Sequence, residues 1–355
     1  MAKRLLVINP GSTSTKVSVF EDGQEIFDTT LRHTADELEQ FTNTYSQKDF
    51  RKEHILNELK EQNIKLENFD AIVGRGGMVR PVQSGTYKIN EAIINDLSNA
   101  VYGEHASNLG AILAKELSVT AGCDAYISDP VVVDEMHDLA RISGHPDLPR
   151  KSIFHALNQK STARTYCKEV NRAYKDVNIL VCHMGGGISV GVHTGGRIID
   201  VNNCVSGSGT FSPERAGTLP AGDLVKMCFS GKYSEYEIQK IINGKGGLMA
   251  HLGENQAHHI VEKINAGDKK AALILDAMAY NIAKEIGAAA TVLDGKIDAI
   301  CLTGGIAYND YVCSRIIKRI SFIAPIKRYP GEGEMGALAN NVTRVLKGLD
   351  ECKEY

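Results

Sequence analysis

The 355-residue sequence lacks several features that would assign it to a specialised class of protein. It has no apolar leader at its N-terminus and no apolar run near the roughly 18 residues that a membrane-spanning helix needs. Its net charge is only −3, so it offers no broad attraction to nucleic acid or to an anionic membrane. We therefore expect no nucleic-acid partner and no membrane association, and any anion site must be built locally.

The eight cysteines show no pattern that would indicate a disulfide framework or a metal site. They are scattered, with no C-x-x-C pair and no Cys/His metal spacing. Such a distribution indicates reduced thiols and predicts a cytoplasmic protein. With 43% hydrophobic and 23% charged residues, the composition is ordinary for a globular enzyme, and the length predicts two domains.

The sequence does contain an internal repeat. Residues 5–28 and 179–200 both read as an apolar strand, a Gly/Ser-rich turn, an alternating strand, a second turn and a third strand ending in Asp. Residues 68–77 and 296–305 form a second matching pair, in which an apolar strand leads into Gly-Gly. Two matches in the same order indicate a duplicated α/β domain, with ligands expected in the cleft between the halves.

The boundary between the halves is predicted near the loop at 143–151, since no Pro/Ser-rich linker marks it. We expect an N-terminal domain at 1–150, joined by a C-terminal helix at 334–355, and a C-terminal nucleotide-binding domain at 151–333. The spacing of apolar residues also predicts two helices, at 49–63 and 268–290.

The first glycine-rich turn, from Asn9 to Lys16, is a candidate phosphate site. Its backbone N–H groups and the hydroxyls of Ser12 and Ser14 can hydrogen-bond phosphate oxygens, and Lys16 adds a positive charge. The segment is not a P-loop, since G-x-x-x-x-G-K-[ST] is absent. Taken alone, an ordinary hairpin turn rich in turn-forming residues explains it equally well.

The second glycine-rich turn, at 183–187, favours the phosphate interpretation. Three consecutive glycines cost backbone entropy, which makes sense where the backbone must approach a ligand closely. Its candidate ligand-binding residues are His183, Gly185, Gly186 and Gly187. The later pair Gly304-Gly305 suits the nucleoside end of the same ligand, although a tight strand-to-helix connection would have the same sequence.

Several charged residues near these turns are candidates for binding an anionic substrate. Arg75 stands between glycines at the end of an apolar strand and could bind a carboxylate bidentately. Asp129 follows another strand and could hold Mg²⁺, although Asp-Pro also begins turns. Glu334 opens the last predicted helix, where it could stabilise the N-terminus or reach a metal. Arg215 is equally well explained as part of a structural ion pair.

Three segments resemble the acetokinase family of the acetate and sugar kinase/Hsp70/actin superfamily: INPGSTSTK at 8–16, CHMGGGIS at 182–189 and VGRGGMVRPVQSGTY at 73–87. The last segment, with YGEHASNLGAILA at 102–114 and ISDPVVVDEM at 127–136, is similar to the butyrate kinase branch. The resemblance covers essentially the whole chain. It implies duplicated actin-like, ribonuclease H-like domains with an interdomain active-site cleft, and a homodimer or higher homo-oligomer.

The resemblance also implies ATP and Mg²⁺ as cofactors and roles for the candidate residues. The phosphate and metal site is implied for Asn9, Ser12, Ser14 and Lys16. Arg75 is implied to bind the carboxylate or the transferring phosphoryl group, and His105 to lie near the substrate. The metal site is implied for Asn9, Asp129 and Glu334, and catalytic roles are considered for Arg75, Asp129, His155 and Arg215.

The chain departs from the acetate kinases at three places. Asn158 stands where they carry a His, and Gly186 where they carry an Asn. No Arg aligns with the one in their Gly-Thr-Arg-Ser-Gly-Asp segment, so Arg215 is a candidate to replace it. These differences weaken the transfer of roles to His155 and Arg215, and they favour the butyrate kinase branch.

The expected reaction is phosphorylation of a short-chain carboxylate by ATP, with butanoate as the first choice. A hydroxyl acceptor needs a general base, whereas a carboxylate is already ionised at pH 7. It needs charge neutralisation, which Arg75, Lys16 and Mg²⁺ can provide. The alternatives are a branched-chain, acetate or propionate kinase, a sugar kinase with Asp129 as base, and a non-enzymatic nucleotide-binding protein.

Overall fold

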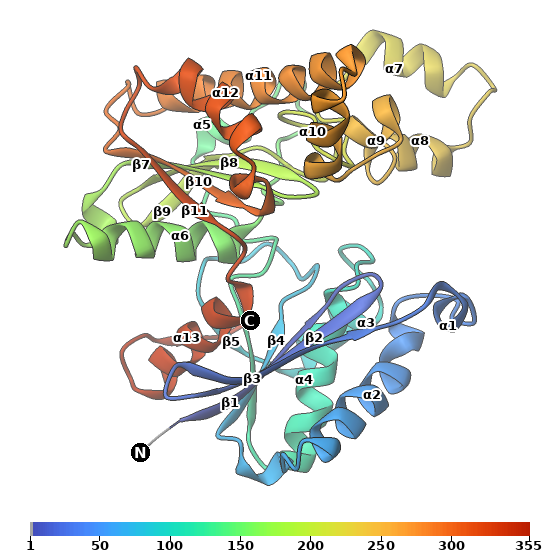
Figure 1. The fold of residues 1–355 in the computed structure, drawn as a ribbon. Helices are drawn as coiled ribbons and strands as arrows, with labels where there is room; N and C mark the ends of the chain where they lie inside the picture. The colour runs from blue at the N-terminus through green and yellow to red at the C-terminus, as the bar shows by residue number, and fades with distance from the viewer. Residues whose placement is uncertain (1–2) are drawn as a thin grey trace. The chain divides into compact units, whose positions relative to one another are not determined.

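The computed structural model describes residues 3–355, which divide into two compact units. Unit 1 combines the chain up to Val133 with Gly333–Tyr355, and unit 2 is Asp134–Glu332. Figure 1 shows this division in colour, since the blue start and the red end of the chain both contribute to unit 1.

The boundary between the units lies earlier than the expected 150/151. Segment 134–150 belongs to unit 2 because its hydrogen bonds go there. The N–H of His137 donates to the carbonyl of Ile199 at 3.0 Å, and Arg150 donates to a carboxylate oxygen of Asp200 at 2.8 Å. The glycine and prolines of the loop at 143–151 therefore mark a surface loop within unit 2.

Unit 1 is built on a seven-stranded sheet of order β12-β5-β6-β4-β1-β2-β3. Its strands are β1 (Arg4–Pro10), β2 (Ser14–Glu21), β3 (Gln24–Arg32), β4 (Ala71–Arg75), β5 (Thr86–Lys88), β6 (Asp124–Ser128) and β12 (Cys352–Lys353). Its α-helices are α1 (Ala35–Glu39), α2 (Lys48–Glu61), α3 (Glu91–Ser98), α4 (Asn108–Ala121) and α13 (Glu334–Leu346). Helices α2 and α4 lie on one side of the sheet and α13 on the other (Figure 1).

Unit 2 is built on a five-stranded sheet of order β11-β10-β7-β8-β9. Its strands are β7 (Ile179–Met184), β8 (Ile188–Thr194), β9 (Arg197–Val201), β10 (Ala299–Gly304) and β11 (Ile326–Pro330). Its α-helices are α5 (Asp138–Arg141), α6 (Ala156–Glu169), α7 (Ala221–Cys228), α8 (Glu235–Ile242), α9 (Gly247–Leu252), α10 (Ala257–Asn265), α11 (Lys269–Thr291) and α12 (Asp310–Ile320). Helix α6 covers one face of the sheet, and α11 and α12 cover the other (Figure 1).

The two sheets repeat one topology, which confirms the predicted duplication. In unit 1, β1, β2 and β3 pair antiparallel, and β4 and β6 extend the sheet in parallel. In unit 2, β7, β8 and β9 pair antiparallel, and β10 and β11 extend the sheet in parallel. Each glycine-rich turn joins the first two strands of its sheet, as the aligned segments predicted.

The predicted helices at 49–63 and 268–290 correspond to α2 and α11, but the C-terminal helix is shorter than expected. Helix α13 ends at Leu346 instead of continuing to 355. Gly348 has φ +68, a left-handed conformation that terminates helices. The chain then forms β12, which pairs with β5 at the edge of the unit 1 sheet.

The described part of the chain contains neither a disulfide nor a membrane span. All eight cysteines are free. Within residues 3–355, no helix combines the length and the apolar character needed to cross a bilayer.

Candidate active site

Three of the predicted residues meet in unit 1 at the C-terminal ends of β1 and β4. Asn9 is near the end of β1 and Arg75 ends β4, and the parallel pairing of the two strands brings them to the same sheet edge. Glu334, the first residue of α13, accepts a hydrogen bond of 2.8 Å from Asn9 Nδ2 and forms an ion pair with Arg75. The side chains of Arg75 and Glu334 are only 9% and 13% exposed, so a paired cation and anion lie in a largely desolvated place.

The first glycine-rich turn lies between β1 and β2 and presents polar groups to solvent. Ser12 and Lys16 are exposed, and Ser14 is half-buried. The turn is closed from within, since the N–H of Gly11 donates to the carbonyl of Ser14 at 2.7 Å. Hydroxyl and ammonium donors at a closed turn suit an anionic ligand.

A buried arginine that we did not predict lies under this turn. Arg51, on α2, is 1% exposed and donates hydrogen bonds to the carbonyls of Gly11 at 2.9 Å and Ser14 at 3.0 Å. Burial lowers its pKa to about 10. One feature of the sequence could have indicated its burial. Arg51, Ile55 and Leu59 are spaced four residues apart, so Arg51 shares a helix face with two apolar residues that are buried.

Asp129 is held by hydrogen bonds on both carboxylate oxygens. It is 1% exposed, follows β6 and has φ +41. Its Oδ1 accepts from Ser84 Oγ at 2.6 Å and from the N–H of Gly85 at 2.9 Å, and its Oδ2 accepts from Asn341 Nδ2 at 3.2 Å. These contacts tie β6 to α13 and to the segment before β5.

The acidic residues of unit 1 fit a magnesium–nucleotide complex better than a dedicated metal cage. Among residues 3–355, no three His, Cys, Asp or Glu side chains gather into a metal-binding group. Mg²⁺ often binds through one or two carboxylates, water and substrate phosphates. The Glu334 carboxylate beside the Asn9 amide fits that pattern. Asp129 fits it less well as a direct ligand, because both of its oxygens already accept hydrogen bonds.

His105 precedes α4 in unit 1 and is exposed. Its Nδ1 lies 2.7 Å from Ser107 Oγ and 3.1 Å from the backbone nitrogen of Ser107, so the ring is hydrogen-bonded to the residue that precedes the helix. The following Asn108 accepts from the N–H of Met78 at 2.8 Å, which links this segment to the chain just beyond Arg75.

In unit 2, two stacked histidines lie beside the second glycine-rich turn. The rings of His155 and His183 are 3.8 Å apart between centroids and inclined by 18°. His183 is 1% exposed, and its Nδ1 lies 2.8 Å from Asn158 Oδ1. The amide group of Asn158 also donates to the carbonyl of Glu332 at 2.7 Å. Asn158, a departure from the acetate kinases, therefore orients His183.

Charged side chains lie against two glycines of the second turn. A Cβ added at Gly187 would overlap the guanidinium of Arg215, and one at Gly186 would lie 3.4 Å from a carboxylate oxygen of Glu214. Arg215 is fixed there by donating to the carbonyl of Cys204 at 2.6 Å and to Asn243 Oδ1 at 3.2 Å. The structure thus places Arg215 directly at the turn. Gly185 opens the turn, with its N–H donating to the Gly187 carbonyl at 3.0 Å.

The two predicted glycines at the end of β10 differ from each other. Gly304 has φ +87, and a Cβ there would overlap the carbonyl oxygen of Met184, so glycine is required by packing against β7. Gly305 has open space around it and lines a pocket. Of the two glycines, Gly305 is the one that lines this pocket.

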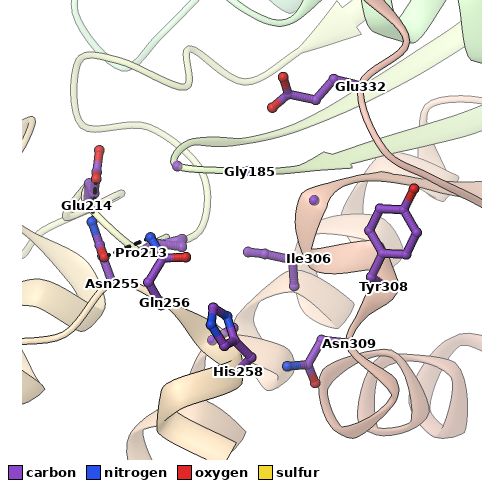
Figure 2. A pocket seen from close by; sticks show the side chains of 13 residues that line it. Gly185, Pro213, Glu214, Asn255, Gln256, His258, Ile306, Tyr308, Asn309 and Glu332 are labelled. Atoms are coloured by element: carbon purple, nitrogen blue, oxygen red, sulfur yellow. Dashed lines mark hydrogen bonds between the residues drawn. The ribbon is translucent and has the colours of Figure 1, made fainter. Parts of the chain in front are cut away.

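That pocket has a volume of about 450 Å³ and lies within unit 2 (Figure 2). Its lining residues are Gly185, Gly186, Pro213, Glu214, Asn255, Gln256, Ala257, His258, Gly305, Ile306, Tyr308, Asn309 and Glu332. Figure 2 shows Asn255, Gln256 and His258 on one side and Ile306 and Tyr308 on the other. The amide side chains from the loop before α10 were not predicted, since they belong to no recognisable pattern.

Comparison with known proteins identifies first the class of fold and then the family. The acetate kinase of Porphyromonas gingivalis superposes with a TM-score of 0.79 at 19% identity, covering 96% of this chain and 99% of that one. The fold is therefore the duplicated actin-like fold of the acetate kinases. The Acetokinase family profile matches residues 147–324.

Two relatives agree over the full length. Butyrate kinase 2 of Clostridium acetobutylicum is 58% identical over 355 residues, covering 100% of both chains. Butyrate kinase 1 of the same organism is 54% identical over 352 residues, covering 99% of each. The chain belongs to the acetokinase family.

Proposed function

We propose that this protein transfers the γ-phosphoryl group of ATP to the carboxylate of a short-chain fatty acid, with butanoate as the preferred acid. The observation that carries the proposal is the 58% identity to a butyrate kinase over the whole chain. The Asn9–Glu334–Arg75 cluster supports it, since it sets a buried guanidinium beside a possible metal ligand.

The nucleotide is assigned to the pocket of unit 2. Its volume of about 450 Å³ falls in the range of small-ligand sites. The backbone of Gly185 and Gly186 lines the pocket and would meet phosphates. Gly305, Ile306 and Tyr308 also line the pocket, and an apolar base and its sugar would lie against them.

The carboxylate and the transferring phosphoryl group are assigned to Arg75 and the first glycine-rich turn. Arg75 can bind two oxygens in its planar fork, and Lys16 adds a point charge. Mg²⁺ fits Glu334 and Asn9 together with nucleotide phosphates, where it would supply neutralisation of phosphate charge.

The chemistry is a direct displacement at phosphorus. A carboxylate oxygen forms a bond to the γ-phosphorus while the bond from that phosphorus to the β,γ-bridging oxygen breaks, which yields an acyl phosphate and ADP. No proton moves, because the acceptor is already ionised at neutral pH. Arg75 and Lys16 reduce the repulsion between the two anions, and the turns hold the reacting atoms in line.

The contacts of Asp129 weigh against a sugar kinase. A sugar hydroxyl must give its proton to a base, and Asp129 was the residue available for that role. Its carboxylate is buried and accepts three hydrogen bonds from Ser84, Gly85 and Asn341. A base that must collect a substrate proton needs an accessible lone pair.

The choice among short acids rests on the relatives alone, because one methylene is worth only about 1–3 kcal/mol of discrimination. Propionate, valerate and isobutyrate are the competing substrates. A cytoplasmic location and a homo-oligomeric state complete the proposal, from the scattered thiols and from the family resemblance.

The test is acyl phosphate formation, trapped as the hydroxamate, with Mg-ATP and acids from acetate to valerate, including isobutyrate. We expect the highest kcat/KM with butanoate. A maximum with isobutyrate would reassign the protein to branched acids. No acyl phosphate from any acid, with folded protein that binds ATP, would overturn the proposal.

A further inference from the structure

Arg51 makes an unusually complete set of hydrogen bonds to one turn. Nη1 donates to the carbonyls of Gly11 at 2.9 Å and Ser14 at 3.0 Å, and Nη2 donates to the carbonyl of Ser12 at 3.1 Å. Nη1 also donates to Thr15 Oγ1 at 3.0 Å. One side chain from α2 thus binds three backbone carbonyls of the first glycine-rich turn.

These contacts determine which way the peptide groups of the turn face. In a planar trans peptide, the C=O of one residue and the N–H of the next point in opposite directions. With the carbonyls of Gly11 and Ser12 turned toward Arg51, the N–H groups of Ser12 and Thr13 point away from it. The oxygens that would repel an anion are hidden, and the donors that would bind one face outward.

The charge of Arg51 has no carboxylate partner among the described residues. Its hydrogen bonds go to neutral oxygens, those of the turn and the Oε1 of Gln47 at 2.8 and 3.1 Å. Its side chain is 1% exposed, and burial of an arginine without a counter-ion is costly. An anion bound at the outer side of the turn would supply the missing negative charge.

Two neighbours hold this arrangement in place. Gln47 accepts from both Nε and Nη2 of Arg51, which fixes the plane of the guanidinium. His33 is 4% exposed, and its Nε2 lies 3.0 Å from Thr15 Oγ1. Since Thr15 Oγ1 accepts from Arg51, its hydroxyl hydrogen is available to His33. The N–H of His33 also donates to the carbonyl of Thr13 at 2.9 Å.

We propose that Arg51 is a positioning residue for phosphoryl transfer: it shapes the first glycine-rich turn so that its N–H groups face the phosphate, and its charge is balanced by that phosphate. The inference rests on the proposed kinase function and adds to it a residue that never touches the substrate. Removing Arg51 frees the carbonyls of the turn and removes a positive charge below it.

The experiment compares Arg51→Met and Arg51→Lys with Leu59→Ala, measuring kcat and both KM values below each variant's unfolding temperature. Leu59 is 2% exposed on the same helix, so its truncation weakens unit 1 without touching the turn. We expect Arg51→Met to lower kcat about 10- to 100-fold, as misplaced reacting groups do, with the KM for butanoate changed less than about twofold. Arg51→Lys should have a kcat between those of Arg51→Met and wild type, because lysine keeps the positive charge but lacks the planar guanidinium that bonds several carbonyls at once.

Leu59→Ala should lower the unfolding temperature and leave kcat within about twofold of wild type, since it acts through packing. Wild-type kcat in Arg51→Met, or an equal loss of kcat in Leu59→Ala, would overturn the inference. If Arg51→Met does not fold, Gln47→Ala provides the test, since it releases two of the guanidinium's hydrogen bonds. An unchanged kcat there overturns the inference as well. Failure of the proposed function shows separately, as a wild-type protein that makes no acyl phosphate.

Discussion

Asn9 donates a hydrogen bond of 2.8 Å to Glu334, although the two residues lie 325 positions apart in the chain. The same carboxylate pairs with Arg75, so one acidic side chain links the ends of two neighbouring strands to the start of the last helix. Because the pair is largely buried, loss of either partner removes an ion pair that little solvent screens. The cluster is therefore sensitive to single substitutions.

Replacing Arg75 by Met should abolish most acyl phosphate formation while leaving nucleotide binding intact. The guanidinium is the cation assigned to the acceptor carboxylate, and loss of such a donor lowers kcat about 100-fold or more. The pocket assigned to ATP lies in unit 2 and contains no unit 1 residue. Titration calorimetry with ADP measures binding, and the hydroxamate assay measures turnover. Arg172→Met, which removes an exposed ion pair with Asp298, serves as the control. Normal turnover in the Arg75 variant contradicts the assignment.

Replacing Asp129 by Asn should lower stability with or without Mg²⁺. The carboxylate accepts hydrogen bonds from Ser84, Gly85 and Asn341, and an amide can satisfy only some of these donors. We expect a loss of about 1–3 kcal/mol in the free energy of unfolding, measured by urea denaturation. A direct metal ligand would behave differently: the variant would keep wild-type stability in EDTA and differ from wild type only when Mg²⁺ is added.

Replacing Gly187 by Ala should raise the KM for ATP by displacing Arg215 from the second turn. The added methyl group occupies the place of the guanidinium, which must then leave its contacts with Cys204 and Asn243. We expect a KM about tenfold higher, from steady-state kinetics at saturating butanoate; a loss of about 1.4 kcal/mol gives this factor. Gly222→Ala is the matched control, because nothing lies near its added methyl group. Equal kinetics in the two variants would show that Arg215 has no part in ATP binding.

The stability of unit 1 should fall as the pH is lowered from about 6.5 to about 4. The pKa of His33 is lowered to about 4, chiefly by burial. The nearby charges of Arg51 and His54 also lower this pKa, and Glu37 has a smaller, opposite effect. Between these pH values the unfolded chain binds a proton that the folded chain does not, so folding is favoured at the higher pH. The contribution reaches about 3 kcal/mol.

The variant His33→Gln tests this pH dependence. Its side-chain oxygen can still accept from the Thr15 hydroxyl, but it does not titrate. The slope of unfolding free energy against pH should flatten between pH 4 and 6.5, and His145→Gln, at an exposed histidine, serves as the comparison variant. A His33→Gln slope equal to that of wild type would show that another group titrates in this range.

Local patterns in the sequence were enough to predict the duplicated fold and the position of its two turns. Strand alternation and glycine clusters depend on neighbouring residues, so 5–28 and 179–200 could be aligned without any tertiary knowledge. The contacts of Arg51 could not be predicted in this way, because a buried arginine depends on carbonyls some 40 residues away. The same holds for the loop residues Asn255 and Gln256, whose place in the pocket follows from tertiary packing. The boundary near Asp134 was missed for a similar reason. The prolines at 146 and 149 indicate a loop, but they do not show whether that loop lies between two domains or within one.

Unit 1 is discontinuous in the chain, and this has a consequence for its synthesis. During translation, residues 134–332 leave the ribosome before Glu334 does, so unit 2 can complete its sheet while the start of the chain still lacks α13. A nascent chain stalled before Gly333 would carry the whole pocket assigned to ATP, but it would lack both Glu334, which pairs with Arg75, and Asn341, which donates to Asp129. The newly made protein therefore completes its proposed nucleotide site first and its proposed carboxylate site last.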